Sequence, residues 1–158
     1  MNKRIGFDIH GVIDKNPPLF RKIINDLKHL GYEIHILTGS LPTKNLLDEL
    51  KEYKIEYDFL FSILEHHKSK GTNMWKDDRG WWVDDDIWNK TKAEYCDSKS
   101  FLFHLDDTKV YGDYFNTPFG HITPLIEKPR ILEIKGDIDD EIIEILKKYE
   151  GYYKIKFI

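Results

Sequence analysis

The sequence predicts an α/β protein, a three-layer sandwich with a central parallel sheet of the Rossmann-like type. In residues 1–107, short apolar runs alternate with segments of helical periodicity, which indicates repeated right-handed β-α-β crossovers. Several apolar runs end in acidic or hydroxyl residues, and the carboxyl ends of parallel strands meet at one edge of a sheet. We therefore expect the functional residues to lie together at that edge.

Clear boundary residues mark the first strand and the first helix. Residues 4–8 form an apolar run that ends in Asp8. Asn16 can cap a helix because its side chain accepts hydrogen bonds from free backbone amides, and Pro17 suits the first helical turn. Gly31 is a typical stop residue, so the helix is expected to end there.

The other elements of the first 107 residues follow from the same signals. In chain order they are a strand at 33–37, a helix carrying Leu46, Leu47, Leu50 and Tyr53, a strand at 57–63, a short helical stretch at 72–76, a strand at 80–83, a helix at 87–95 and a strand at 101–105. The strands at 80–83 and 101–105 are both followed by aspartates. Both strands are expected in the parallel sheet.

The chain is predicted to be a single domain spanning residues 1–158, with a core at about 1–107 and an extension at 108–158. Within the extension, residues 111–129 contain three prolines and are expected to form a long surface loop. The extension then continues with a strand at 130–135, a helix at 139–149 and a strand at 152–157.

Composition argues against several classes of protein. Hydrophobic residues make up 41% of the chain and charged residues 33%, which is ordinary for a globular protein and argues against a membrane span. The net charge of −4 does not indicate nucleic-acid binding, although a local basic groove stays open. Cys96 is the single cysteine and no signal-like apolar stretch follows Met1, so a cytoplasmic location is expected.

The acids at the strand ends suit phosphoryl transfer. Transfer through an aspartyl-phosphate needs a carboxylate nucleophile, a divalent cation that neutralises phosphate charge, and a fixed positive charge. Mg²⁺ prefers hard oxygen ligands and usually keeps several waters, so two carboxylates and one backbone carbonyl suffice. Asp8, Asp85 and the carbonyl of His10 are the expected metal ligands.

Four segments carry a family resemblance. Residues 6–14 form an apolar strand followed by Asp-x-His-Gly-Val, and residues 36–39 form an apolar strand followed by Thr-Gly. Lys70, or less favourably Lys68, comes next. Residues 82–89 then contain an apolar strand, the pair Asp84-Asp85, and Asn89 four residues after Asp85. In order and spacing this resembles the four motifs of the haloacid dehalogenase-like hydrolase superfamily. The resemblance covers the predicted core but not the extension.

The resemblance implies a Mg²⁺-dependent phosphohydrolase without a large cap domain, because about 30 residues separate Asp8 from Thr38 and again Thr38 from Lys70. It implies that Asp8 attacks phosphorus, that Thr38, Gly39 and Lys70 hold the phosphoryl group, and that Asp85 binds the metal. A phosphorylated small molecule or nucleotide is the expected substrate, with a nucleic-acid end phosphate as a further candidate. Capless members tend to act on bulky substrates or to close their sites by oligomerisation, so an oligomer stays open.

His10 departs from the family pattern, because most phosphatases of the family have a second aspartate there. In the family that residue protonates the leaving oxygen and later activates water. An imidazole exchanges protons near neutral pH, so His10 could replace the carboxylate. The alternative is a non-catalytic phosphate- or nucleotide-binding protein. A third interpretation, a receiver-like signalling domain, fits poorly because residues 57–63 end in no acid.

Three further acids have two interpretations each. Asp106 and Asp107 could border the pocket at the end of their strand, or lie solvated in a loop. Asp14 could assist the chemistry, or cap the helix that follows.

Overall fold

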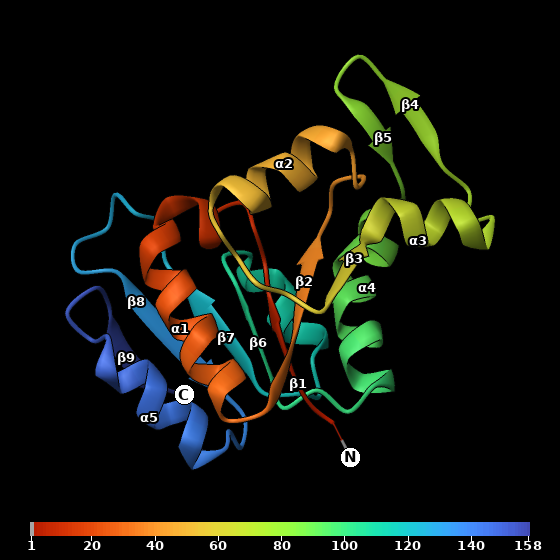
Figure 1. Cartoon of the computed structure of the whole chain (residues 1–158). Helices are drawn as coiled ribbons and strands as arrows, with labels where there is room; N and C mark the ends of the chain where they lie inside the picture. Colours follow the sequence, from red (N-terminus) through yellow and green to blue (C-terminus); the bar gives the residue numbers. More distant parts are fainter. Residues whose placement is uncertain (1) are drawn as a thin grey trace.

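The computed structural model describes residues 2–158 and shows an α/β fold built on a seven-stranded sheet (Figure 1). The strand order is β3-β2-β1-β6-β7-β8-β9. Strands β3, β2, β1, β6 and β7 run parallel, β8 is antiparallel to β7, and β9 is parallel to β8. The strands are β1 (Lys3–Phe7), β2 (Tyr32–Thr38), β3 (Phe59–Ser62), β6 (Phe103–Asp106), β7 (Phe119–Ile122), β8 (Ile131–Lys135) and β9 (Lys154–Phe157).

Five α-helices connect the strands: α1 (Pro17–His29), α2 (Lys44–Glu52), α3 (Ile63–Lys70), α4 (Asp85–Ser98) and α5 (Asp140–Lys148). Two 3-10 helices, at Ile13–Lys15 and Lys109–Tyr114, complete the connections. The predicted start of α1 is confirmed, because the Asn16 side chain accepts a hydrogen bond from the Leu19 amide at 3.3 Å. Thr43 and Ser62 cap α2 and α3 in the same way.

Helices cover both faces of the sheet, so the predicted α/β class and layered architecture are confirmed (Figure 1). Apolar residues of α1, α2 and α5 pack on one face in the larger core cluster. On the other face, α4 and the 3-10 helix Lys109–Tyr114 pack against Leu37, Phe101 and Phe119 in a smaller cluster. The smaller cluster is the one that borders the candidate site.

The two-residue period of β1 and β6 decides which side chains reach α4. Phe7 and Leu105 point into the larger core, as side chains alternate along a strand. Asp8, His104 and Asp106 therefore project to the opposite face, where α4 lies. Because β1 and β6 are neighbours, the acids that end them come together.

The strand predicted at 80–83 does not belong to the sheet, which corrects the expectation from the sequence. Residues Gly80–Trp82 form β5, which pairs antiparallel with β4 (Trp75–Asp77) in a separate hairpin. The helical stretch expected at 72–76 is also wrong. Helix α3 ends at Lys70, Gly71 caps it in the left-handed conformation, and β4 begins at Trp75. The hairpin rises on the side to which the arrow of β2 points (Figure 1).

The surface loop expected at 111–129 contains the buried strand β7 (Phe119–Ile122), a third correction. The three prolines of this segment, Pro118, Pro124 and Pro129, all lie outside β7, so they do not interrupt its ladder. Gly120 allows close packing here, because a Cβ at this position would lie 2.5 Å from the Phe103 ring. None of the helices within residues 2–158 combines the length and apolar character needed to cross a bilayer.

Candidate functional site

Asp8 and Asp106, from the ends of β1 and β6, are bridged by a buried lysine from α4. Lys92 Nζ donates to Asp8 Oδ1 at 3.0 Å and to Asp106 Oδ2 at 2.8 Å. Lys92 is 2% exposed and Asp106 is fully buried, whereas Asp8 keeps 7% exposure. An ammonium group has three hydrogens, so one remains beyond these two bonds.

Asp106 serves as the anchor of this lysine. Its Oδ2 accepts from Lys92 and lies 2.9 Å from His104 Nε2, and its Oδ1 accepts from the Thr108 amide at 3.1 Å. Burial acts to raise the pKa of Asp106, but the Lys92 ammonium and the His104 hydrogen bond outweigh it and hold the pKa far below its usual range. Burial likewise opposes the charge on Lys92, yet Asp106 and Asp8 raise its pKa. The pair is therefore ionised.

Asp107 lies beside Asp8 at the rim of the cluster. A Cβ on Gly11 would lie 2.0 Å from Asp107 Oδ2, and Gly11 has a φ of 93°, so only glycine suits this turn. Arg130 Nη2 donates to the Gly11 carbonyl at 3.1 Å. Burial lowers the pKa of its guanidinium, and the charges of Asp107 and Asp14 oppose this. The extension at 108–158 thus reaches the candidate site through Arg130.

The donor set fits a divalent cation. The carboxylate oxygens of Asp8, Asp106 and Asp107 lie within 4.8 Å of one another, while Lys92 is the cation that hydrogen-bonds to two of them. Burial raises the pKa of Asp8 well above its usual range, and the negative charge of Asp106 adds to this although Lys92 opposes it. A hard cation would relieve this crowding of negative charge. Asp8 and Asp107 would hold it, because Asp106 is already engaged on both oxygens.

Thr38 and Gly39 lie where the sequence predicted, at the carboxyl end of β2 next to β1. The buried Thr38 hydroxyl accepts a hydrogen bond from the Ser40 amide at 3.2 Å, which leaves its own proton to donate. A Cβ on Gly39 would lie 2.6 Å from the Trp88 ring of α4. The turn after β2 is therefore packed against the helix that carries Lys92.

The His10 side chain points to α2. It is 47% exposed, and its Nε2 lies 3.5 Å from Glu49 Oε2. Asp14 is close to both, and its Oδ1 accepts from the Gly11 amide at 2.7 Å. His10 thus lies in the turn that follows Asp8, with its ring directed to α2.

Lys70 and Asp85 do not take the places expected of them. Lys70, like Lys68, is exposed on α3, and the lysine that pairs with Asp8 is Lys92. Asp85 is exposed in the first turn of α4, and among residues 2–158 it joins neither group of potential metal ligands. Both corrections have one cause, since the strand beside β1 is β6 rather than the run at 80–83.

The sequence contains a signal that Lys92 is buried, but the order of the family motifs directed attention to Lys70 instead. Trp88, Lys92 and Cys96 are spaced by four residues, so they share one face of α4. A lysine inside an otherwise apolar stripe needs a buried partner. The run Asp106-Asp107 supplies that partner.

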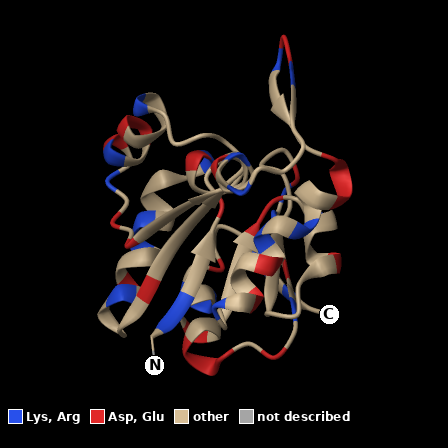
Figure 2. Ribbon diagram, turned by 90° about the vertical axis from the view of Figure 1, so that its right-hand side faces the viewer, with Lys and Arg blue, Asp and Glu red and all other residues tan. Residues whose placement is uncertain are grey.

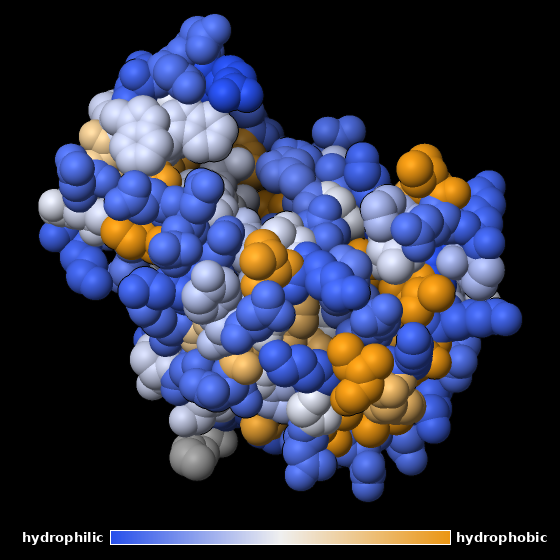
Figure 3. All heavy atoms as spheres, turned by 180° about the vertical axis from the view of Figure 1, so that it is seen from behind, coloured by the Kyte–Doolittle hydropathy of each residue, from blue (hydrophilic) through white to orange (hydrophobic). Residues whose placement is uncertain are grey.

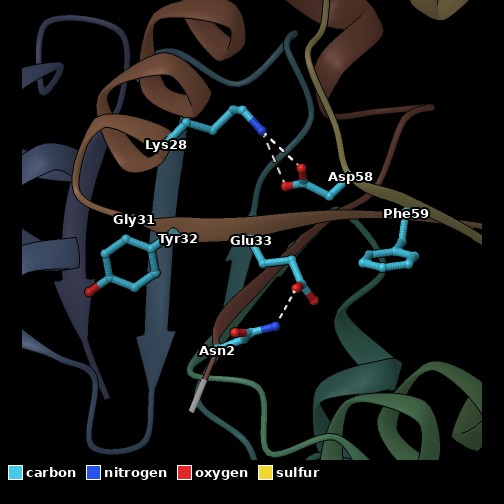
Figure 4. A pocket seen from close by; sticks show the side chains of 7 residues that line it. All are labelled: Asn2, Lys28, Gly31, Tyr32, Glu33, Asp58 and Phe59. Atoms are coloured by element: carbon cyan, nitrogen blue, oxygen red, sulfur yellow. Dashed lines mark hydrogen bonds and ion pairs between the residues drawn. The ribbon is translucent and has the colours of Figure 1, made fainter.

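Figure 4 shows a hollow that lies away from these residues. Its residues come from the amino ends of β1 and β2, from the start of β3 and, for Lys28, from the last turn of α1, at the sheet edge opposite Asp8. The charged groups there already pair with neighbours, Lys28 with Asp58 at 3.1 Å and Asn2 with Glu33 at 2.9 Å. It offers no free group for chemistry within the described part of the chain. Its lining residues are Asn2, Lys28, Gly31, Tyr32, Glu33, Asp58 and Phe59.

Comparison with known proteins yields no match to any protein-family model, to any curated protein or to any solved structure.

Proposed function

We propose that the protein is a Mg²⁺-dependent phosphohydrolase that works through an aspartyl-phosphate on Asp8. The observation that carries the proposal is the strand-end cluster, defined as Asp8, Lys92, Asp106 and Asp107. It combines a partly accessible carboxylate, a buried cation and additional acids at the carboxyl edge of a parallel sheet. These are the parts that phosphoryl transfer through a carboxylate requires.

The cluster assigns the two oxygens of Asp8 to different tasks. Oδ1 accepts from Lys92 and keeps a second lone pair that would bind Mg²⁺, so Oδ2 is the oxygen left to attack phosphorus. The new bond joins Oδ2 to phosphorus while the ester bond breaks, and the leaving oxygen takes a proton. Water then attacks the phosphorus and gives a proton to His10, which lost one to the leaving oxygen in the first step. The bond between phosphorus and Asp8 Oδ2 breaks, inorganic phosphate leaves and the Asp8 carboxylate is restored.

The remaining groups stabilise charge. The third hydrogen of Lys92 and the Thr38 hydroxyl are donors for the phosphoryl oxygens. When bound by Asp8 and Asp107, Mg²⁺ would neutralise negative charge on those oxygens. His10 is the proton donor we assign to the leaving group. These groups support the resemblance to the haloacid dehalogenase-like superfamily. In this proposal Lys92 takes the role expected of Lys70, and Asp107 takes the metal-binding role expected of Asp85.

We infer the substrate class from the β4–β5 hairpin, which rises on the side to which the arrow of β2 points (Figure 1). The β4–β5 hairpin forms a projection separated by a notch from the rest of the upper edge (Figure 3). It exposes Trp75, and the cations of Lys76 and Arg79 lie over the rings of Trp81 and Trp82. Acidic and basic residues are interspersed over the ribbon, and the hairpin tip carries both signs (Figure 2). We propose a nucleotide, or another phosphoester with an aromatic group, as substrate.

The test is a panel of phosphomonoesters, including nucleotides and oligonucleotide end phosphates, assayed with and without Mg²⁺. We expect Mg²⁺-dependent release of phosphate that Asp8→Asn abolishes, because the amide is nearly isosteric but cannot form the acyl phosphate. Asp48→Asn, an exposed change on α2, is the control and should retain activity. Activity that survives in Asp8→Asn refutes the nucleophile assignment.

One observation favours the competing function of a non-catalytic phosphate- or nucleotide-binding protein. His10 stands at the usual acid/base position, yet its exposed ring faces Glu49 rather than the strand-end cluster. This function predicts binding of phosphate or nucleotide by titration without turnover. Turnover that appears only in His10→Asp, and not in the wild type, would establish the non-catalytic function for the natural protein.

A further inference from the structure

His10 faces a carboxylate from a different part of the chain. Its Nε2 lies 3.5 Å from Glu49 Oε2, and Glu49 belongs to α2 whereas His10 follows β1. The donor atoms of His10, Glu49 and Asp14 all lie within 4.8 Å of one another. Asp14 Oδ1 is occupied by the Gly11 amide at 2.7 Å. Glu49, rather than Asp14, forms the ion-pair contact with the imidazole.

Glu49 is itself fixed from its other side. The Tyr53 hydroxyl donates to Glu49 Oε1 at 3.0 Å, across one turn of α2. Burial and the hydrogen bond to Glu49 raise the pKa of Tyr53 to about 12, so the hydroxyl stays protonated at neutral pH and keeps donating. With Oε1 engaged, Oε2 is the oxygen that faces His10.

We propose that Glu49 is a positioning residue for His10 and that Tyr53 holds Glu49 in place. This inference rests on the proposed phosphohydrolase function. Glu49 occupies Nε2, so Nδ1 is the nitrogen left to give a proton to the leaving oxygen. The chain thereby places on α2 a carboxylate that works through the histidine, where the family pattern has an aspartate at position 10 itself.

The pairing with Glu49 can contribute by orienting the imidazole of His10. The His10 side chain is 47% exposed and that of Glu49 is 27% exposed, and an ion pair so open to solvent adds little to folding stability. An exposed imidazole without a partner samples several rotamers, whereas proton transfer requires one geometry. The loss of Glu49 should therefore appear in the chemical step rather than in the fold.

The experiment uses the dependence on the leaving group. An alkoxide needs a proton as it departs, whereas p-nitrophenolate departs readily without one. We compare the first-turnover burst of leaving-group release from an alkyl phosphate and from p-nitrophenyl phosphate, because the burst isolates the first step. Glu49→Gln should slow the alkyl phosphate by roughly 10- to 100-fold at unchanged KM, and p-nitrophenyl phosphate several-fold less.

Three further variants sharpen the comparison. Tyr53→Phe should show the same pattern with a smaller loss, because Glu49 remains but is less restrained. Glu52→Gln, an exposed change at the end of the same helix, is the matched control and should behave as wild type. The double variant His10→Ala/Glu49→Gln should be no slower than His10→Ala, since Glu49 acts only through the histidine.

The positioning role is overturned if Glu49→Gln matches Glu52→Gln, if it slows both substrates equally, or if its loss adds to that of His10→Ala. In those cases turnover by the wild type would still support the proposed phosphohydrolase activity, and only the role of Glu49 would be refuted. If the wild type hydrolyses neither these two substrates nor the broader panel, the proposed function itself fails, and the role of Glu49 fails with it.

Discussion

Two acidic runs look alike in the sequence and behave differently in the structure. Asp84 to Asp86 and Asp106 to Asp107 each follow a short apolar run. The first run is exposed where α4 begins, whereas Asp106 is fully buried and Asp107 partly buried at the end of β6. The difference lies in their neighbours, because β6 pairs with β1 while β5 pairs only with β4.

Position in the sheet, rather than local sequence, decides whether these acids stay solvated or become buried and need a partner. Carboxylates in the first turn of α4 stay solvated and interact with the positive end of the helix dipole. Asp106 lost its water and must be compensated, which Lys92 and His104 accomplish. Asp107 keeps enough access to serve as a ligand.

The largest expected effect is on folding stability, and it distinguishes Lys92, which pairs with Asp106, from Lys70, which the sequence motifs had suggested. Lys92→Met should lower the free energy of unfolding by about 3–5 kcal/mol, because it leaves the buried acids Asp8 and Asp106 without their cation. Lys70→Met, at an exposed position, should change it by less than about 0.5 kcal/mol. Urea denaturation of both variants at neutral pH measures the difference. Similar losses for the two variants would contradict the buried pairing.

A smaller effect is expected on metal affinity. Asp107→Asn should weaken Mg²⁺ binding by at least about tenfold, since it neutralises a carboxylate that we assign as a ligand. Asp85→Asn should leave the affinity unchanged, because Asp85 is exposed outside the cluster. Calorimetric titration with Mg²⁺ compares them. If Asp85→Asn proved the more damaging change, the ligand would come from the first acidic run, as the motif order predicted.

The smallest expected effect concerns the contact that holds α4 against α3. His67 Nδ1 and Nε2 lie 2.9 Å from Thr72 Oγ1 and 2.8 Å from Thr91 Oγ1, and burial lowers the pKa of His67. The fold therefore favours neutral His67. The stability it contributes is present above the unfolded-state value of about 6.5 and is lost as pH falls through that value toward the lowered one.

Urea denaturation between about pH 7.5 and 5.5 checks this dependence. The wild type should lose up to about 1 kcal/mol more than His67→Gln over that interval, an amount comparable with one hydrogen bond. Parallel pH profiles for the two proteins would show that His67 does not hold the helices together.

The local elements were the predictable part of the fold. The start of α1 depends on Asn16 and Pro17, and the signals for both lie within a few residues. Strands β1 and β2 follow from short apolar runs, which also places Asp8 and Thr38 at their carboxyl ends. Strand β7 escaped prediction because its flanking prolines indicate a loop, while its burial depends on pairing with β6 and β8.

The sequence by itself determined the α/β class, the first two strands and the residues Asp8, Thr38 and Gly39 at their ends, because caps and side-chain periodicity act over a few residues. Only the tertiary structure decided which lysine and which acids join them. Lys92 meets Asp8 across 84 positions of the chain, in a contact that no local pattern encodes. A buried charge is tolerated only where the fold brings it a partner. The packing of α4 against the sheet therefore decided which charged residues meet Asp8.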